Sequence, residues 1–161
     1  MVPGPAAAVF TWHEGPQALR DLLPRSRWVR IEDRTGGIRN DGRATLRFGI
    51  GRVAFRWEAR HYGYVRGRQF CDEQVRGPFT TWRHTHRFEA VGDRQTLYED
   101  HIEWALPGGR LVNRIAGVIL PILLARAFEH RHAIVRARFA LPTRTVTPAL
   151  PRGHSATTLR G

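Results

Sequence analysis

Two histidines separated by a single residue, His84 and His86, stand in the segment of this sequence that is best suited to chemistry. Successive side chains of a β-strand point to opposite faces, so both imidazoles would lie on the same face as Trp82 and Phe88. The two histidine positions would be about 7 Å apart along the strand. Imidazole titrates near neutral pH, and such a pair facing a substrate could act as a general acid and a general base. The other interpretation is structural: the two rings make hydrogen bonds that fix the strand or close the polar end of a pocket.

An inward-facing histidine requires a hydrogen-bonding partner, because burying an unpaired polar group costs about 1 to 3 kcal/mol. The predicted strand that follows the pair offers Asp100, and the preceding strand carries Asp72. These two aspartates could form the paired carboxylates of an acid–base mechanism. The many arginines of the chain favour ion pairing instead, with Arg131 or Arg56 as the partner.

A His-x-His pair on a strand, together with a carboxylate, is also a common way to build a metal site. A cupin is disfavoured, because Glu89 would face outward from the predicted strand and the domain would end in a long apolar helix. Since hydrogen bonding is the favoured role of the two histidines, we expect no bound metal and no cofactor. A metal site at the His-x-His pair is the alternative.

The elements that must position these residues follow from the periodicity of the apolar side chains. An alternation of period two runs from residue 43 to residue 106, and glycine-containing turns interrupt it at regular intervals. This pattern predicts an antiparallel meander with one buried face. From about residue 111 to residue 139 the period becomes helical, with a kink or break predicted at Pro121. The predicted fold class is α+β, a curved antiparallel sheet wrapped around a long C-terminal helix with a central cavity.

The segments outside this frame give weaker signals. Residues 9–13 predict a strand, residues 15–23 a short helix that Pro24 stops, and residues 28–31 another strand. Residues 1–8 and 141–161 hold few large apolar side chains that could offset the entropy of ordering them. We therefore predict one domain, residues 9–140, between two disordered tails.

The charge is the most unusual feature of the composition. All 26 basic residues are arginine, and 14 acidic residues leave a net charge of +12. The arginines are spread along the chain and no nucleic-acid-binding motif accompanies them, which favours a solvated sheet face over a specific nucleic-acid site. Peripheral contact with an anionic membrane stays open, as does the oligomeric state. The single cysteine, Cys71, excludes an internal disulfide.

The longest apolar run, residues 115–125, is shorter than the roughly 20 residues of a membrane-spanning helix. We expect it to be a helix buried against its own sheet. The N-terminus lacks the basic opening and apolar stretch of a secretory signal, so a cytoplasmic location is expected.

The order of several motifs along the chain is more specific than any one of them. They are Arg56-Trp57-Glu58-Ala59, Phe70 with Asp72 and Gln74, Gly77-Pro78-Phe79, Trp82 with His84, His86 and Phe88, Asp100, Leu106-Pro107 and Arg131-His132. In this order they resemble the START-like and polyketide cyclase superfamily, called SRPBCC, and within it a bacterial ligand-binding branch. The resemblance covers residues 43–135. It implies the helix-grip fold, with a pocket for a small hydrophobic molecule between sheet and helix.

The resemblance implies no particular ligand and no catalytic residue. Members of the superfamily carry lipids, sterols, plant hormones or polyketide intermediates, and some are aromatases or cyclases. Fold alone does not choose among these activities.

Residues and resemblance together lead us to expect a protein that binds a small hydrophobic or amphipathic ligand, lipid-like or polyketide-like, with enzymatic activity left open. One alternative is a cyclase, dehydratase or aromatase in which His84 or His86 is the base and Asp100 its orienting partner. Another is a protein whose basic surface binds anionic lipid or nucleic acid. The expected ligand-binding residues are Trp57, Phe70, Asp72, Gln74, Trp82, His84, His86, Phe88, Asp100, Ile102, Trp104 and Phe128.

Overall fold

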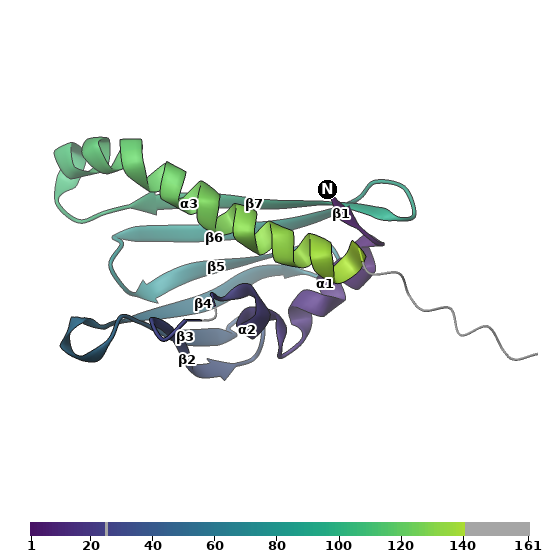
Figure 1. Cartoon of the computed structure of the whole chain (residues 1–161), viewed down its shortest axis with the longest axis horizontal. Helices are drawn as coiled ribbons and strands as arrows, with labels where there is room; N and C mark the ends of the chain where they lie inside the picture. Colours follow the sequence, from purple (N-terminus) through teal and green to yellow (C-terminus); the bar gives the residue numbers. More distant parts are fainter. Residues whose placement is uncertain (25, 141–161) are drawn as a thin grey trace, which may run out of the picture.

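The computed structural model of the protein describes residues 1–24 and 26–140, and the predicted C-terminal tail lies outside this part of the chain. Its main feature is a curved antiparallel sheet in the order β1-β7-β6-β5-β4-β3-β2, with the long helix α3 lying across one face (Figure 1). The predicted helix-grip architecture is confirmed. In chain order the elements are β1 (Val2–Pro3), α1 (Ala6–Glu14), α2 (Ala18–Leu22), β2 (Val29–Thr35), β3 (Arg43–Phe48), the short 3₁₀ helix η1 (Gly51–Val53), β4 (Phe55–Val65), β5 (Gln69–Arg76), β6 (Thr81–Ala90), β7 (Gln95–Ala105) and α3 (Gly109–Ala140).

Strands β3 to β7 form the predicted meander, because each pairs with the next strand along the chain, and β2 extends it by pairing with β3. The turn after β3 depends on Gly49, whose φ is 98° and whose backbone lies so close to the Val53 carbonyl that an added Cβ would clash with it. In β4, the register relative to β5 shifts between Glu58 and Ala59 and again between Tyr62 and Val65. Such irregularities bend a strand, and here they help to curve the sheet around α3.

The outer face of the sheet carries arginines that pair with acidic residues on neighbouring strands. Arg56 Nε lies 2.6 Å from Glu32 Oε2 across β2, β3 and β4, and Arg60 pairs with Glu73 on β5. Exposed pairs of this kind contribute about 0 to 1 kcal/mol each, so they keep the face solvated more than they stabilise the fold. Arg56 is therefore not the partner of either inner-face aspartate.

The first residues of the chain belong to the domain, and the prediction of a disordered tail over residues 1–8 is wrong. Val2 lies opposite Thr96 at the edge of the sheet, and the backbone N–H of Gly4 donates to the carbonyl of Arg94. Val2 is 2% exposed, so pairing with β7 and apolar burial together offset the entropy of ordering this segment.

The strand predicted for residues 9–13 is also wrong, because these residues lie within helix α1. Helical spacing brings Val9, Phe10 and His13 to the protein interior, where all three are buried. The alanines at positions 6 to 8, which sequence analysis assigned to a tail, are strong helix formers and extend α1 back to Pro5.

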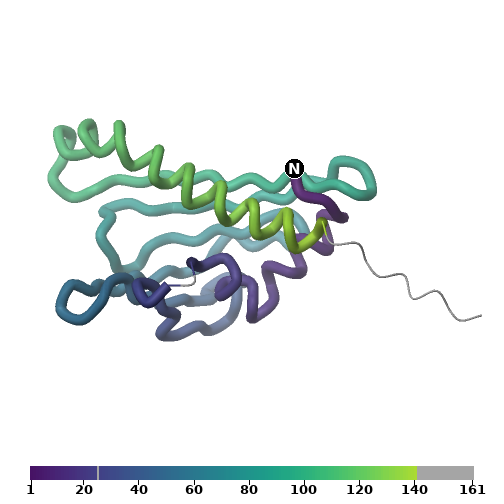
Figure 2. The backbone as a smooth tube through the Cα atoms, viewed as in Figure 1, coloured from purple at the N-terminus to yellow at the C-terminus, as the bar shows by residue number. Residues whose placement is uncertain are grey.

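Helix α3 continues through Pro121 as one helix, so the break considered for this position does not occur. Its second half packs against the N-terminal segment: Val135 is fully buried, and the ring of Phe139 lies 3.3 Å from a Cβ placed on Gly4. Figure 2 shows the N-terminus of the chain beside the end of α3. The two ends of the domain thus hold each other in place.

The first half of α3 is exposed, contrary to the expectation that the run 115–125 is buried against the sheet. The helix crosses the sheet obliquely, and the core lies under its second half (Figure 1). By length and composition α3 could cross a membrane, since its most apolar window has a mean hydropathy of 1.7 and none of that window is buried. The exposed apolar side chains of this half are Leu111, Val112, Ile115, Val118, Ile119, Ile122 and Leu123.

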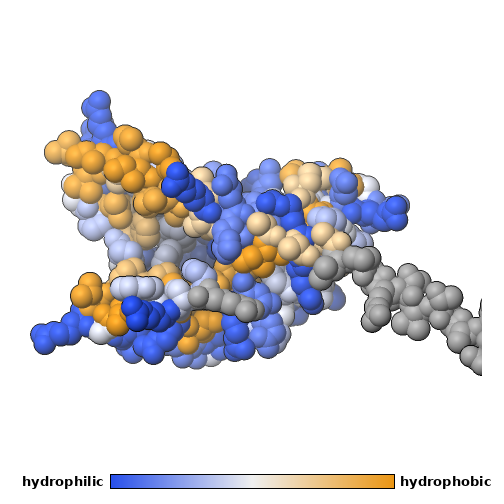
Figure 3. Space-filling model, in the orientation of Figure 1, coloured by the Kyte–Doolittle hydropathy of each residue, from blue (hydrophilic) through white to orange (hydrophobic). Residues whose placement is uncertain are grey.

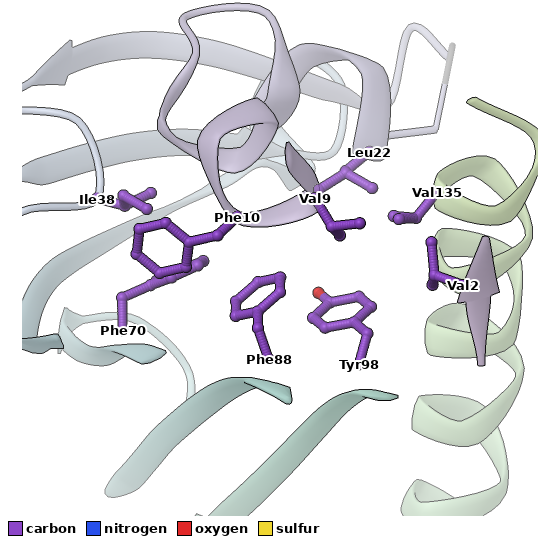
Figure 4. Packing of buried hydrophobic residues seen from close by; sticks show 9 residues of the cluster. All are labelled: Val2, Val9, Phe10, Leu22, Ile38, Phe70, Phe88, Tyr98 and Val135. Carbon is purple, nitrogen blue, oxygen red and sulfur yellow. The ribbon is translucent and has the colours of Figure 1, made fainter. Parts of the chain in front are cut away.

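The hydrophobic core lies between α1, the right-hand part of the sheet in Figure 1, and the second half of α3. Phe10 is its centre, with its ring 5.3 Å from Phe88 and 6.3 Å from Phe70 in edge-to-face contacts. Figure 4 shows Tyr98 beside Phe88, and their two rings are stacked with centroids 4.9 Å apart. The buried members are Val2, Val9, Phe10, Leu22, Ile38, Phe70, Phe88, Tyr98 and Val135.

Candidate functional site

Strand register gathers the predicted polar residues on the inner face of the sheet. On β5 and β6, Asp72 lies directly opposite His84, and on β6 and β7, His86 lies directly opposite Asp100. Residues opposite each other on one face have Cβ atoms about 4.5 to 5.5 Å apart, so side chains from three strands meet here.

Both histidines lie between the two carboxylates. Asp72 Oδ2 is 3.2 Å from His84 Nδ1 and 3.2 Å from His86 Nε2. On the other side, Asp100 Oδ1 is 2.9 Å from His84 Nε2 and 2.8 Å from His86 Nδ1. The imidazole centroids are 3.8 Å apart, and each imidazole contacts both aspartates through different nitrogens. We call Asp72, His84, His86 and Asp100 the His–Asp cluster.

Helix α3 joins this cluster through His132, which the sequence analysis named in the Arg131-His132 motif but not among the site residues. His132 Nε2 lies 2.6 Å from Asp100 Oδ2, and the hydroxyl of Tyr98 donates to Asp100 Oδ1 over 3.2 Å. The predicted partner Arg131 instead places its guanidinium over the ring of Phe128, 4.9 Å from the centroid. In the described part of the chain the partners of Asp100 are histidines and Tyr98, so the prediction of an arginine partner is wrong. The sequence offered one indication of this role: His132 is four residues after Phe128, so both lie on the same face of the helix.

The electrostatics of the His–Asp cluster follow from burial opposed by close opposite charges. Burial alone would raise the pKa of Asp72 and of Asp100, but the histidines attract and hydrogen-bond both carboxylates and hold each pKa below its ordinary value. Burial would lower the pKa of His84, and the two aspartates outweigh it and raise that pKa. Burial, followed by the charge of Asp100, raises the pKa of Tyr98, which keeps its phenol protonated.

A cavity of about 350 Å³ lies between the sheet, α2 and α3, and the His–Asp cluster forms part of its wall. Seven of the twelve expected ligand-binding residues line it: Trp57, Phe70, Asp72, Trp82, His84, His86 and Phe128. These residues share the cavity because they all take inward positions on strands or on α3, and their binding of a ligand stays a prediction.

The other five expected ligand-binding residues are absent from this lining. Gln74 holds the turn between β5 and β6, since its side-chain amide both donates to the carbonyl and accepts from the N–H of Phe79. Phe88 belongs to the core, and Asp100 lies behind the two histidines. Ile102 and Trp104 are opposite His84 and Trp82 on β7, beyond the cavity wall.

Much of the lining comes from segments in which sequence analysis proposed no site. The short helix α2 and the residues after it contribute apolar side chains, and β2 and β4 contribute Arg34 and His61. Because the sequence positions of these groups are remote from one another, only the folded arrangement brings them together. His61 had one signal, its inward alternation with Trp57 and Ala59 on β4.

His13 on α1 is a further buried histidine at the edge of the cavity. Its Nδ1 lies 2.8 Å from the carbonyl oxygen of Val9, and its ring packs 4.9 Å from Phe88 and 5.1 Å from Tyr98. Burial lowers the pKa of His13 to about 3, so the folded protein keeps this ring neutral over most of the acid range.

Replacing His13 with phenylalanine is expected to weaken the acid sensitivity of the fold. In the unfolded chain the ring takes up a proton below about pH 6.5, whereas the folded chain does so only near its lowered pKa, so protons favour unfolding between these values. The free energy of unfolding of the wild type should fall by up to about 1.4 kcal/mol per pH unit more steeply than that of His13→Phe. Urea titrations at several pH values measure both slopes, and parallel curves for the two proteins would contradict the assignment.

The solved structures to which the chain is similar share this architecture. An aromatase/cyclase di-domain protein, StfQ, from the steffimycin biosynthetic pathway gives a TM-score of 0.61 at 14% identity, over 84% of this chain and 47% of the two-domain protein. A START superfamily protein from Mycobacterium smegmatis gives 0.53 at 19% identity, over 86% of this chain and 92% of the other. The protein TTHA0849 from Thermus thermophilus gives 0.61 at 14% identity, over 86% and 92%.

The sequence itself gives no such match: no protein-family model matches it, and no curated protein does. At these identities the structural similarity establishes the fold. The resemblance expected from the order of the motifs is thereby confirmed at the level of fold.

Proposed function

From the helix-grip fold that this chain shares with START-like proteins, we propose that it binds a small hydrophobic or amphipathic molecule between the sheet and α3. The observation that carries the proposal is the cavity of about 350 Å³, walled by aromatic and aliphatic side chains on most sides. Ligand pockets in proteins range over roughly 300 to 1,000 Å³ and combine an apolar lining with a few convergent polar groups.

The polar wall of this cavity specifies what the ligand carries at one end. Asp72, His84 and His86 face the cavity from the sheet, and His130 and Arg131 contribute from α3. These groups offer both donors and acceptors, so a hydroxyl, carbonyl or carboxylate on an otherwise apolar molecule would be held there. A purely hydrocarbon ligand would make no hydrogen bond to these polar groups, so a ligand with a polar end fits this wall better.

Filling the cavity should abolish ligand binding. Ala127 lines the cavity from α3, and Ala127→Trp places an indole where the ligand would lie. Native mass spectrometry of protein purified without denaturation should show an adduct of a few hundred daltons on the wild type and none on this variant. Organic extraction then identifies the molecule.

The matched control is Ala125→Trp, on the same helix but outside the cavity lining, which should keep the adduct. A wild type that carries no adduct and takes up none from a cellular lipid extract would contradict the proposal. Equal retention of the adduct by the Ala127→Trp variant would contradict the assigned location.

A second candidate is a cyclase- or dehydratase-type enzyme on a polyketide-like substrate. The observation that favours it is the pair of imidazoles beside an aspartate on the cavity wall, a set of groups that can move a proton. Incubating the extracted molecule or its poly-β-ketone precursor with the protein distinguishes the two candidates. A new product, identified by mass spectrometry, would favour the enzyme, and an unchanged molecule would favour the carrier.

A third candidate function is peripheral binding to an anionic bilayer, which the exposed half of α3 favours. The start of α3 lies at the same end of the molecule as the segment between β3 and β4 (Figure 1). That segment contains η1, where Val53 is 86% exposed. Figure 3 shows the two apolar areas on either side of a hollow in the surface. Large contiguous apolar patches on a protein surface commonly mark interaction sites.

The positive charge of this end of the molecule indicates which kind of lipid it would bind. Between Gly109 and Phe128 the sequence contains three arginines and no acidic residue. A helix with an apolar face and flanking arginines inserts into the headgroup region of anionic lipid, where each basic residue contributes about 1 kcal/mol. The occupant we propose for this surface is therefore an anionic lipid bilayer.

A further inference from the structure

Three potential ligand atoms for a metal converge where the His–Asp cluster faces the cavity. One side-chain atom each of Asp72, His84 and His86 lies within 4.8 Å of the other two. The two nitrogens that face Asp72 Oδ2 are His84 Nδ1 and His86 Nε2, at 3.2 Å each. Ligands held about 2.0 to 2.2 Å from one metal ion are separated by distances of this size.

A cation would suit these three atoms, because all three can be hydrogen-bond acceptors at the same time. A neutral imidazole has one N–H donor and one acceptor nitrogen. The buried carboxylate of Asp100, 3% exposed, requires donors and faces His84 Nε2 and His86 Nδ1 at 2.9 Å and 2.8 Å. If His84 Nε2 donates to Asp100, and His86 Nδ1 donates to Asp100 or to the Tyr98 hydroxyl 3.2 Å away, the remaining nitrogens are acceptors that point at a third acceptor, Asp72 Oδ2. A metal ion between them would satisfy all three lone pairs.

The surroundings of the histidines match the way in which proteins support a metal site. Histidines that bind a metal usually donate their second N–H to a carboxylate, which fixes the tautomer and orients the ring. One carboxylate, Asp100, serves both rings here. It is itself fixed by His132 Nε2 at 2.6 Å and by the hydroxyl of Tyr98 at 3.2 Å. The imidazoles are therefore held in place before any ion arrives.

We propose that Asp72, His84 and His86 bind a divalent first-row transition metal ion on the cavity wall, with Asp100 orienting both imidazoles. Two imidazole nitrogens and one carboxylate oxygen favour ions such as Zn²⁺, Fe²⁺ or Co²⁺ over Mg²⁺ and Ca²⁺, which prefer oxygen ligands. Three protein ligands leave coordination positions toward the cavity, where an oxygen of a bound molecule could enter. Binding of the ion requires no organic ligand, so the inference stands apart from the proposed function.

The experiment is a titration of the purified full-length chain, stripped with EDTA and dialysed, with Co²⁺ alone. Elemental analysis should find about one Co²⁺ per chain, with visible d–d absorption bands of nitrogen and oxygen coordination. A large excess of Mg²⁺ should leave the bands unchanged. Asp72→Asn and His86→Gln should each weaken Co²⁺ binding by at least about 10-fold.

The matched control is His101→Gln, since His101 is an exposed histidine on β7 that lies outside the cavity lining and outside the proposed ligands. This variant should bind Co²⁺ as the wild type does, and circular dichroism and urea unfolding check that every variant is folded. A folded wild type without stoichiometric Co²⁺ binding would overturn the proposal and leave the cluster as two histidines paired with two aspartates. Unchanged binding in both folded ligand variants would also overturn it, because the Co²⁺ would then be held elsewhere.

Discussion

Replacing Asp100 with asparagine is expected to cost about 3 to 5 kcal/mol of unfolding free energy, because it removes one partner from a buried set of charged groups. Asp100 is the common acceptor for His84, His86 and His132. The asparagine amide has the same shape as the carboxylate, but its NH₂ group is a donor and cannot accept from the imidazole N–H groups around it. Those N–H groups would then lack an acceptor. Because His132 belongs to α3, the substitution also loosens the attachment of the helix to the sheet.

The measurement is urea unfolding near pH 7 in the presence of EDTA, so that bound metal does not contribute. The pKa of Asp100 lies below its ordinary value, so its stabilising contribution is complete at neutral pH and is lost only as the pH falls below about 4. The matched control is Asp93→Asn in the exposed hairpin after β6, which should change stability by no more than about 0.5 kcal/mol. A loss below about 1 kcal/mol for Asp100→Asn, with an unchanged denaturant dependence, would contradict the central position assigned to this residue.

Anionic vesicles are expected to bind this protein about 100-fold more strongly than neutral vesicles, since three arginines near the surface contribute about 1 kcal/mol each. Co-sedimentation with phosphatidylglycerol-containing vesicles and with pure phosphatidylcholine vesicles measures this ratio. Binding should weaken steeply as salt rises, because surface charges are screened. Equal affinity for the two lipids would contradict the proposed bilayer contact.

The apolar face of α3 needs its own test, since a chain with a net charge of +12 is attracted to any anionic surface. Val118→Asp places a charge in the centre of the exposed face, at a side chain that is 70% exposed. Val91→Asp makes the same change of charge in the hairpin between β6 and β7, at the opposite end of the sheet. Only the α3 variant should reduce binding strongly, and equal reductions by both would show that charge alone governs association.

The arrangement of the His–Asp cluster also connects the metal inference with the ligand hypothesis. If the Co²⁺ titration succeeds, a polar group of the cavity ligand has a Lewis acid available beside it. If it fails, the same side chains remain a polar wall without a metal ion. Native mass spectrometry tests ligand binding in the cavity in either case. The metal hypothesis and the ligand hypothesis can therefore fail independently.

Local signals in the sequence were enough to predict the elements that carry the site. Alternation from residue 43 to residue 106 predicted the meander, and the same alternation placed His84 and His86 on the inner face beside Trp82. These predictions held because the direction of a strand side chain depends only on its position in the strand. The helical period after residue 109 predicted α3 for the same reason.

Tertiary packing, in contrast, was needed to show which of these groups meet. Asp72 and Asp100 could have paired with arginines, and it was the register of β5, β6 and β7 that set them on opposite sides of the two histidines. His132 reaches Asp100 because α3 crosses the sheet at one particular angle, and no local pattern encodes that angle. Packing also orders the first residues of the chain, since burial of Val2 offsets the entropy of ordering them. Residues 9–13 are helical because that spacing buries Val9, Phe10 and His13, and the alanines before them favour a helix locally.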